Sequence, residues 1–351
     1  MASGASSSSP LPSGLLENWT RVQLAQSARA RFHDEGFLSV TGAFSSPTGY
    51  DPFSDIAHDY DSPVAAHLDP LSISVHGVKN VGGVDIGYDP IDRDLAIVVL
   101  VILSFPSLEL KHTFKRRIKP TQPYVPSFLS MRELEHVEGI YDEAVEVLPD
   151  IDKPDVVFVD GFGRWHERQA GLATAFGVER GLVTIGIGKE YQPLRPDLAQ
   201  FVCDDMWEAP MPPWPHHERE RENFRTKQKL FRHYAQQALQ SRGDWLGVPL
   251  YRHGPLVGAA VLTAPLLKPR ASTTPAYISP GHGICLGSAI ALTVACCMRR
   301  GVKLPEPIVL ADRIGREELR AIRQEKEDAA LTGTRIDISA GAARRATSEK
   351  A

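Results

Sequence analysis

The segment KPDVVFVDGFGRWHERQAG, residues 153–171, contains an apolar run that ends on a carboxylate. The run 156–159 is short and rich in β-branched residues, which is typical of a fully buried strand. Asp160 follows it directly, with two glycines and His166 just behind. Because an unpaired carboxylate is costly to bury, Asp160 requires a hydrogen-bond network, a base or a metal ion as its partner.

Strands and helices alternate on both sides of this segment, which indicates an α/β fold with a mixed sheet flanked by helices. Three strands are expected before it, and the helix that follows them has Ser130 as its N-cap and Glu133 completing a capping box. The expected strands are 82–89, 95–106, 108–118, 155–160, 182–188, 255–264 and 276–282, and the expected helices are 127–148, 167–178 and 284–300.

One main domain is expected over 76–320, with an insertion at about 191–245 and a flexible segment at either end of the chain. Residues 1–75 form an acidic arm with 3 basic and 8 acidic side chains, largely flexible apart from a helix near 17–32. Residues 191–245 are rich in Pro and Trp and then charged, and are interpreted as an insertion. The tail 321–351 is expected to be flexible, so both ends of the chain are predicted to be disordered.

The composition excludes several classes of protein. With 42% apolar and 23% charged residues, the 351-residue chain is not disordered throughout. A net charge of −4 argues against a strongly basic nucleic-acid binder, although a local basic groove is compatible with it. The four cysteines form no metal or disulfide pattern, and no apolar run is long enough to span a bilayer. We therefore expect an intracellular protein, cytoplasmic or nuclear, that has no membrane partner.

Three carboxylates can converge at one edge of the expected sheet. Asp85 lies within the first strand, Glu133 near the start of a helix, and Asp160 at the end of the fourth strand. Converging carboxylates repel one another, and a hard divalent cation such as Mg²⁺ offsets that repulsion. Each acid also has a separate structural interpretation, as a helix cap for Glu133 and as a core hydrogen-bonding group for Asp85.

Six segments together resemble segments of the endonuclease V family. They occur in the same order, and at about the same spacing, as in that family. They are GGVDIGYD (82–89), PYVPSFLSMRE (123–133), VDGFGRWHERQAGLATAFGV (159–178), TIGIGK (184–189), AYISPGHGICLGSAIAL (276–292) and LPEPIVLADRIGRE (304–317). The resemblance covers roughly 80–190 and 245–317. It implies a ribonuclease H-like fold and cleavage at the second phosphodiester bond 3′ to inosine, with Mg²⁺ as cofactor and Mn²⁺ as a possible substitute.

The resemblance also implies roles for individual residues. Asp85, Glu133 and Asp160 would hold the metal. Lys189 would lie beside the scissile phosphate as a point charge. His166 would support the site, unless it is only a helix cap or a surface side chain. His282 would lie near the metal and the nucleophilic water, where a neutral imidazole can orient that water or transfer a proton.

A wedge and a base pocket are implied next to these residues. Tyr124, between prolines that stiffen the backbone, would fill the gap left by a flipped base. Ser127 stands where the family usually has Gly, and a backbone contact to the base survives that difference. The basic run 111–120 is a candidate stripe for phosphates. The implied substrate-binding residues are Pro123, Tyr124, Val125, Pro126, Ser127, Leu129 and Gly161.

These observations predict a Mg²⁺-dependent, inosine-specific endonuclease. Inosine-containing single-stranded RNA is favoured over deaminated DNA, with a role in DNA repair as the other possibility, and a monomer is favoured. Two alternatives stay open: another ribonuclease H-like nuclease with no preference for inosine, and a protein that binds inosine-containing nucleic acid without cutting it. Retention of Asp85, Glu133, Asp160 and Lys189 argues against a pure binder, because converging acids repel phosphate.

Overall fold

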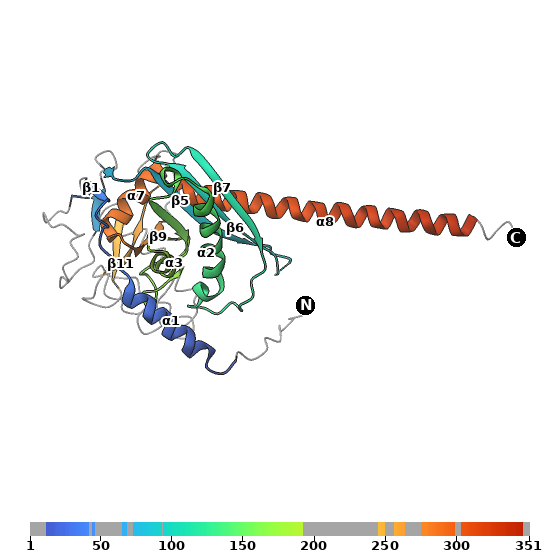
Figure 1. Cartoon of the computed structure of the whole chain (residues 1–351), viewed down its shortest axis with the longest axis horizontal. Coiled ribbons are helices and arrows are strands. Elements are labelled where there is room, and N and C mark those ends of the chain that lie inside the picture. The colour runs from blue at the N-terminus through green and yellow to red at the C-terminus, as the bar shows by residue number, and fades with distance from the viewer. Residues whose placement is uncertain are drawn as a thin grey trace, which may run out of the picture.

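The computed structural model describes residues 12–41, 44–45, 65–68, 73–92, 94–191, 245–249, 256–263, 275–298 and 303–346 (Figure 1). Its helices are α1 (Leu15–Arg29), α2 (Leu129–Val147), the short 3₁₀ helix Asp150–Asp152, α3 (Leu172–Arg180), α7 (Leu286–Met298) and α8 (Glu306–Ala346). Its strands are β1 (Ser39–Thr41), β2 (Phe44–Ser45), β3 (Ala65–Leu68), β4 (Ser74–His76), β5 (Asn80–Tyr88), β6 (Ala96–Ser104), β7 (Leu110–Ile118), β8 (Val156–Asp160), β9 (Val183–Gly188), β10 (Trp245–Pro249), β11 (Leu256–Val261) and β12 (Ala276–His282).

Ten of these strands form one mixed sheet, in the order β2-β3-β10-β11-β12-β9-β8-β5-β6-β7. The neighbours β5, β8 and β9 run parallel, and every other adjacent pair is antiparallel. The predicted α/β class is therefore confirmed. The three parallel strands also end at the same edge of the sheet, where the functional residues lie.

Helices cover both faces of the sheet, as β6 shows most directly. The odd-numbered residues Ile97 to Leu103 pack in one apolar cluster with side chains of α7 and α8, whereas the even-numbered Ala96 to Ile102 pack with α2 and α3. A strand covered on both faces must be apolar at every position, which accounts for the uninterrupted run that the sequence shows there. In Figure 1, α8 continues far beyond the body of the molecule.

A glycine on β5 allows the start of α8 to cross the sheet closely. A Cβ atom at Gly83 would lie 2.4 Å from the carbonyl carbon of Pro307, so no larger side chain fits without displacing α8. Asp85 lies two residues further along the strand on the same face. This close crossing places the second turn of α8, and with it Asp312, above the acidic end of β5.

The helix predicted near 17–32 corresponds to α1 (Leu15–Arg29). In the described part, α1 is one helix whose side chains Trp19, Gln23 and Gln26 are buried, and β1 pairs with β4. The buried amides of Gln23 and Gln26 find their partners only in the tertiary fold, so composition does not reveal them. Residues 46–64 lie outside the described residues, as do 192–244, which contain most of the predicted insertion.

The prediction for the start of α2 is corrected. Ser130 does not cap α2: the N-cap residue is Phe128 and no side chain caps this end. The Ser130 hydroxyl instead accepts a hydrogen bond from Gln23, and Glu133 is bound by Tyr88, so neither member of the predicted capping box reaches the backbone. The segment 321–346, expected to be flexible, is the continuation of α8, in keeping with its many Ala, Glu and Arg residues and its lack of Pro.

Within the described residues, no helix is both long and apolar enough to span a membrane.

Candidate active site

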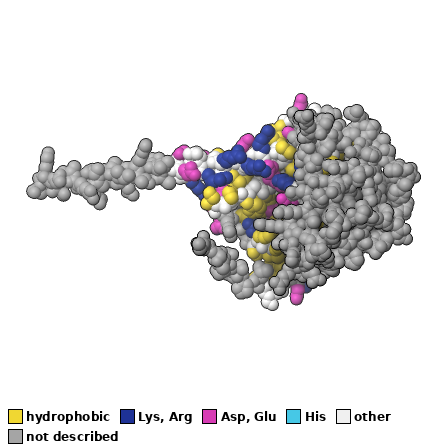
Figure 2. All heavy atoms as spheres, turned by 180° about the vertical axis from the view of Figure 1, so that it is seen from behind, with side chains coloured by type: hydrophobic (Ala, Val, Ile, Leu, Met, Phe, Trp, Pro, Cys, Tyr) yellow, Lys and Arg dark blue, Asp and Glu magenta, His cyan; other side chains and the backbone are white. Residues whose placement is uncertain are grey.

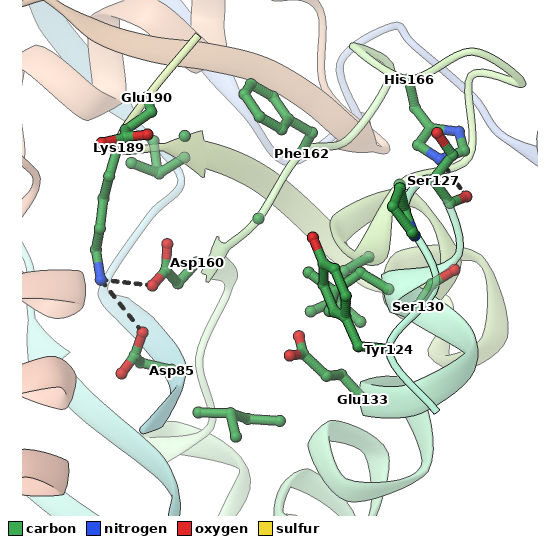
Figure 3. A pocket seen from close by; sticks show the side chains of 18 of the residues that line it. Asp85, Tyr124, Ser127, Ser130, Glu133, Asp160, Phe162, His166, Lys189 and Glu190 are labelled. Carbon is green, nitrogen blue, oxygen red and sulfur yellow. Dashed lines mark hydrogen bonds and ion pairs between the residues drawn. The ribbon is translucent and has the colours of Figure 1, made fainter. Parts of the chain in front are cut away.

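Three of the predicted residues meet where the parallel strands end (Figure 3). Asp85 lies on β5, Asp160 is the last residue of β8, and Lys189 directly follows β9. The ammonium nitrogen of Lys189 lies 2.6 Å from Oδ2 of Asp160 and 3.5 Å from Oδ1 of Asp85. Lys189 therefore bridges two carboxylates that would otherwise repel each other.

A third carboxylate that the sequence analysis did not single out completes this cluster. Asp312 of α8 places Oδ1 3.2 Å from the Lys189 nitrogen. Its other partner is Arg316, one turn further along the helix, at 2.7 Å. Asp312 lies inside the segment 304–317 that resembles the family, but a lone acid on a charged helix gives no local signal. Only the crossing of α8 over β5 reveals its position.

Burial controls the charge of this cluster. Asp85 is 6% exposed, and its desolvation, followed by its hydrogen bond and repulsion with Asp160, raises its pKa well above the usual range. Burial alone would lower the pKa of Lys189, but the three carboxylates outweigh it and raise that pKa. Lys189 is therefore a cation at neutral pH, whereas Asp85 tends to keep its proton even beside Lys189.

Glu133 lies across the cavity, in the second turn of α2, and is held by Tyr88 of β5. The Tyr88 hydroxyl donates to Oε1 of Glu133 at 2.7 Å, and the Arg132 guanidinium lies 5.0 Å from the Tyr88 ring centroid. Glu133 is only 5% exposed, and burial raises its pKa to about 7 despite the bond from Tyr88. No strand or helix pattern marks Tyr88 as a partner, so the sequence analysis missed it.

The cluster has the donor chemistry of a divalent-metal site, although its carboxylates are not already gathered around one point. Among the described residues, no three His, Cys, Asp or Glu side chains are arranged as ligands of a single metal ion. Burial raises the pKa of Asp85 and of Glu133, and an added positive charge would favour the ionised form of both carboxylates. Carboxylate oxygens are the ligands that Mg²⁺ prefers, and a dication would supply that charge.

A cavity of about 640 Å³ joins the acids to the predicted base pocket. Such a volume falls within the range of small-ligand sites. Tyr124 stands at its rim with 67% of its surface exposed. Pro123 is the one predicted substrate-binding residue that lies outside the lining. The lining includes Asp85, Tyr124, Val125, Pro126, Ser127, Leu129, Glu133, Asp160, Gly161, Phe162, His166 and Lys189.

His166 supports the wall of this cavity. Its Nε2 lies 3.0 Å from the carbonyl oxygen of Ser127, and its Nδ1 accepts a hydrogen bond from the Arg168 amide at 3.2 Å. These partners assign the proton to Nε2. Burial and the neighbouring Arg168 lower the pKa of His166 to about 4, so the ring is neutral. The imidazole thus fixes a backbone carbonyl and contacts no acid of the cluster.

His282 does not lie near the acids, and its predicted position was wrong. On β12, which runs antiparallel to β9, it opposes Thr184, whereas Lys189 follows the other end of β9. The two positions are separated by about 16 Å of strand. The Nδ1 atom of His282 accepts a hydrogen bond from the Arg31 amide at 3.2 Å. His282 therefore anchors the chain that follows α1. The position beside the acidic cluster that was predicted for His282 is closer to that of Asp312.

The basic run 111–120 is mostly neutralised. Four of its five cations pair with carboxylates of other segments, and β7 is an edge strand whose charges meet α2 on one side and α8 on the other. Figure 2 shows Lys and Arg side chains gathered where α8 meets the body, with acidic groups among them. The pairs are Lys111–Asp152, Lys115–Glu318, Arg116–Glu143 and Lys119–Asp94.

Comparison with known proteins gives a consistent result. The family model of Endonuclease V matches residues 65–203 and 225–313. Endonuclease V of Homo sapiens is 33% identical over 246 residues, which cover 70% of this chain and 73% of the human protein. Endonuclease V of Gloeobacter violaceus is 30% identical, covering 66% of this chain and 72% of its own.

Solved structures agree. The catalytic domain of human Endonuclease V superposes with a TM-score of 0.62 at 27% identity, covering 89% of this chain and 99% of that one. A Ciona intestinalis Endonuclease V in complex with inosine-containing DNA gives the same TM-score at 22% identity, covering 88% of this chain and 98% of that one, a likeness of fold. The chain belongs to the Endonuclease V family and is an endonuclease.

Proposed function

We propose that this endonuclease cuts nucleic acid at the second phosphodiester bond 3′ to inosine, with Mg²⁺ as its cofactor and Mn²⁺ as a substitute. The observation that carries the proposal is that one cavity is lined both by Asp85, Asp160 and Lys189, which form a cluster with Asp312, and by the predicted base-pocket residues from Tyr124 to Leu129. Lesion recognition and phosphodiester chemistry would then take place in one continuous space.

The metal would be held by Asp85, Glu133 and Asp160, with Asp312 close enough to take part. Family members are metal-dependent nucleases, and the uncompensated charge of these carboxylates supports a dication here. When bound, Mg²⁺ would polarise the phosphodiester and lower the pKa of a coordinated water. The choice of Mg²⁺ rests on the all-oxygen donor set.

Lys189 would supply the remaining positive charge. Its pKa is raised by the surrounding carboxylates, so it stays protonated throughout the physiological range. A protonated amine that is already held in place can stabilise negative charge developing on a phosphate oxygen without reorganisation. Glu133 is buried on the opposite side of the cavity, where Tyr88 holds it. It would bind the metal from that side.

The inosine base would enter between the segment 124–129 and Gly161. Tyr124 is exposed at the rim and can stack into the space that the extruded base leaves, while Ser127, Leu129 and Gly161 line the same cavity. The Ciona intestinalis relative is complexed with DNA in which a ribo-adenosine follows the inosine. That ribonucleotide supports a preference of this chain for inosine in single-stranded RNA.

Four matched oligonucleotides test the proposal: single-stranded RNA and DNA, each with and without one inosine, incubated with Mg²⁺. We expect cleavage only of the inosine-containing strands, faster for RNA, with the product ending at the second phosphodiester bond 3′ to inosine. Cleavage that ignores inosine would favour a general ribonuclease H-like nuclease. Binding of inosine strands with no cleavage in Mg²⁺ or Mn²⁺ would refute the nuclease proposal in favour of a binding protein.

A further inference from the structure

The wall of the base pocket is a short segment, 124–129, that three side chains hold from behind. The carbonyl oxygen of Ser127 accepts hydrogen bonds from Arg168 at 2.7 Å, from His166 at 3.0 Å and from Gln23 at 3.2 Å. Ser127 itself has a φ of 64°, a conformation that non-glycine residues adopt only at a cost. The surrounding bonds therefore impose a backbone geometry that Ser127 would not adopt alone.

Gln23 is the member of this set that comes from a distant part of the chain. It lies on α1 and is completely buried. Its amide nitrogen also donates to the Ser130 hydroxyl at 3.0 Å, and its amide oxygen accepts a bond from Arg168 at 2.5 Å. With both donor hydrogens and the acceptor engaged, the orientation of this amide is fully determined. A fully satisfied buried amide of this kind specifies one arrangement of its neighbours.

The same helix also packs against this segment with an aromatic side chain. The rings of Trp19 and Phe128 lie 5.6 Å apart between centroids, and the Arg168 guanidinium lies 4.3 Å from the Phe128 ring centroid. Gln23 is not part of the cavity lining, whereas Ser127 and Leu129 are. Any influence of α1 on the substrate therefore passes through the segment 124–130, in which the Ser127 carbonyl and the Ser130 hydroxyl are the two groups bonded to Gln23. Helix α1 also lies outside the residue ranges that the family model matches.

We infer that Gln23 is a positioning residue for base recognition. By fixing the Ser127 carbonyl together with Arg168 and His166, it sets the width of the base pocket, so that α1 contributes to the discrimination of hypoxanthine from bases that carry an extra exocyclic group. This inference rests on the proposed function. It assigns to α1 a role in specificity beyond anchoring the start of the chain.

Gln26 provides a matched control on the same helix. It is 2% exposed, and its amide donates to Glu179 of α3 at 3.1 Å, away from the 124–129 segment. Gln26→Ala removes a buried amide from the same helix without removing a contact to the 124–129 segment, so it controls for a general loosening of α1. Gln23→Glu complements Gln23→Ala. It keeps the size of the side chain and an oxygen that accepts the hydrogen bond from Arg168, but it loses the amide N–H that donates to the Ser127 carbonyl.

The test compares two readouts in the full-length protein for wild type, Gln23→Ala, Gln23→Glu and Gln26→Ala. The first is the ratio of kcat/KM for single-stranded RNA containing inosine to that for the same RNA with guanosine, which differs by one amino group. The second is hydrogen exchange of the peptide that contains 124–131, in which the Phe128 amide donates to the Val125 carbonyl at 3.0 Å.

We expect both Gln23 variants to reduce the inosine-to-guanosine ratio about tenfold or more and to accelerate exchange in 124–131, while Gln26→Ala preserves both. The inference is overturned if the Gln23 variants keep the wild-type ratio and exchange, or if Gln26→Ala changes both equally. A wild-type enzyme that cuts both RNAs at the same rate would give a distinguishable result. It would overturn the proposed inosine specificity, and with it the role in discrimination.

Discussion

The ammonium of Lys189 lies 2.6 Å from Oδ2 of Asp160, at the point where two parallel strands end side by side. Lys189 also reaches Asp85 and Asp312, so one cation offsets three carboxylates. Asp312 has a second cationic partner in Arg316, whereas Asp85 and Asp160 share the ammonium of Lys189. The balance makes the site sensitive to any change in its cations.

Replacing Lys189 by Met should make the site depend on metal for its stability. Without the ammonium, Asp85, Asp160 and Asp312 repel one another, so the metal-free protein should unfold at a lower temperature and gain more from added Mg²⁺ than wild type does. Cleavage should fall by about 100-fold. Thermal unfolding in EDTA and in Mg²⁺ measures the first effect. Lys153→Met, which removes an exposed pair with Asp150, is the control. Equal Mg²⁺ shifts in all three proteins would contradict the prediction.

Glu133 should make the metal-free protein less stable as pH rises. Its pKa is about 7 in the folded state against an ordinary value of 4.5, so the folded state binds the proton more tightly. Its contribution to stability is full below the lower value and is lost as pH rises through about 7. The loss is on the order of 3 kcal/mol. Urea unfolding in EDTA between about pH 5 and about pH 8 should show this decline in wild type and a shallower one in Glu133→Gln. Parallel curves would show that Glu133 is not the group involved.

Ser127 should be replaceable by Gly with a gain in stability. Its φ of 64° costs an L-residue about 1–2 kcal/mol, which exceeds the entropic cost of Gly of about 0.5–1 kcal/mol. Ser127→Gly should therefore raise the free energy of unfolding by roughly 0.5–1 kcal/mol. Ser127→Val, β-branched at the same φ, should lower it by about 1–3 kcal/mol. Chemical denaturation of the two variants checks the pair, and a stable Val variant would mean that the segment relaxes to another conformation.

Much of this fold can be predicted from the sequence because several of its strands have a distinctive run of apolar residues. The runs of β6 and β8 are apolar at nearly every position, and no other element satisfies such a pattern so well. Asp160 is likewise visible from sequence, since it ends one of those runs. The expected β7 and β9 also fall close to their observed bounds.

The features that could not be predicted from the sequence depend on where helices cross strands and on contacts between residues far apart in the chain. Asp312 reaches the site only because Gly83 lets α8 approach β5, and Gln23 has meaning only beside Ser127. His282 was placed at the site by resemblance, but the antiparallel register of β12 puts it at the far end of β9. The local sequence pattern contains no information about such tertiary contacts. For the same reason it gave a wrong prediction for the cap at Ser130.

Tyr124 should matter more for base-paired substrates than for single strands. It is 67% exposed, so Tyr124→Ala should leave stability within about 0.5 kcal/mol of wild type. Extruding a paired base costs a few kcal/mol, and the ring compensates by filling the gap. We expect kcat/KM to fall about 10- to 100-fold for inosine within a duplex and less in a single strand. Tyr124→Phe should retain most activity. An equal loss on both substrates would contradict a wedge role.

The most direct measurement is single-turnover cleavage of an inosine-containing RNA in Mg²⁺ by wild type and by Asp160→Asn, with the product ends mapped. Asp160→Asn keeps the shape of the side chain and removes its charge beside Lys189. We predict that wild type cuts at the second phosphodiester bond 3′ to inosine and that the variant binds the RNA but does not cut it. Undiminished cutting by Asp160→Asn, at the same bond, would contradict the assignment of this carboxylate cluster as the active site.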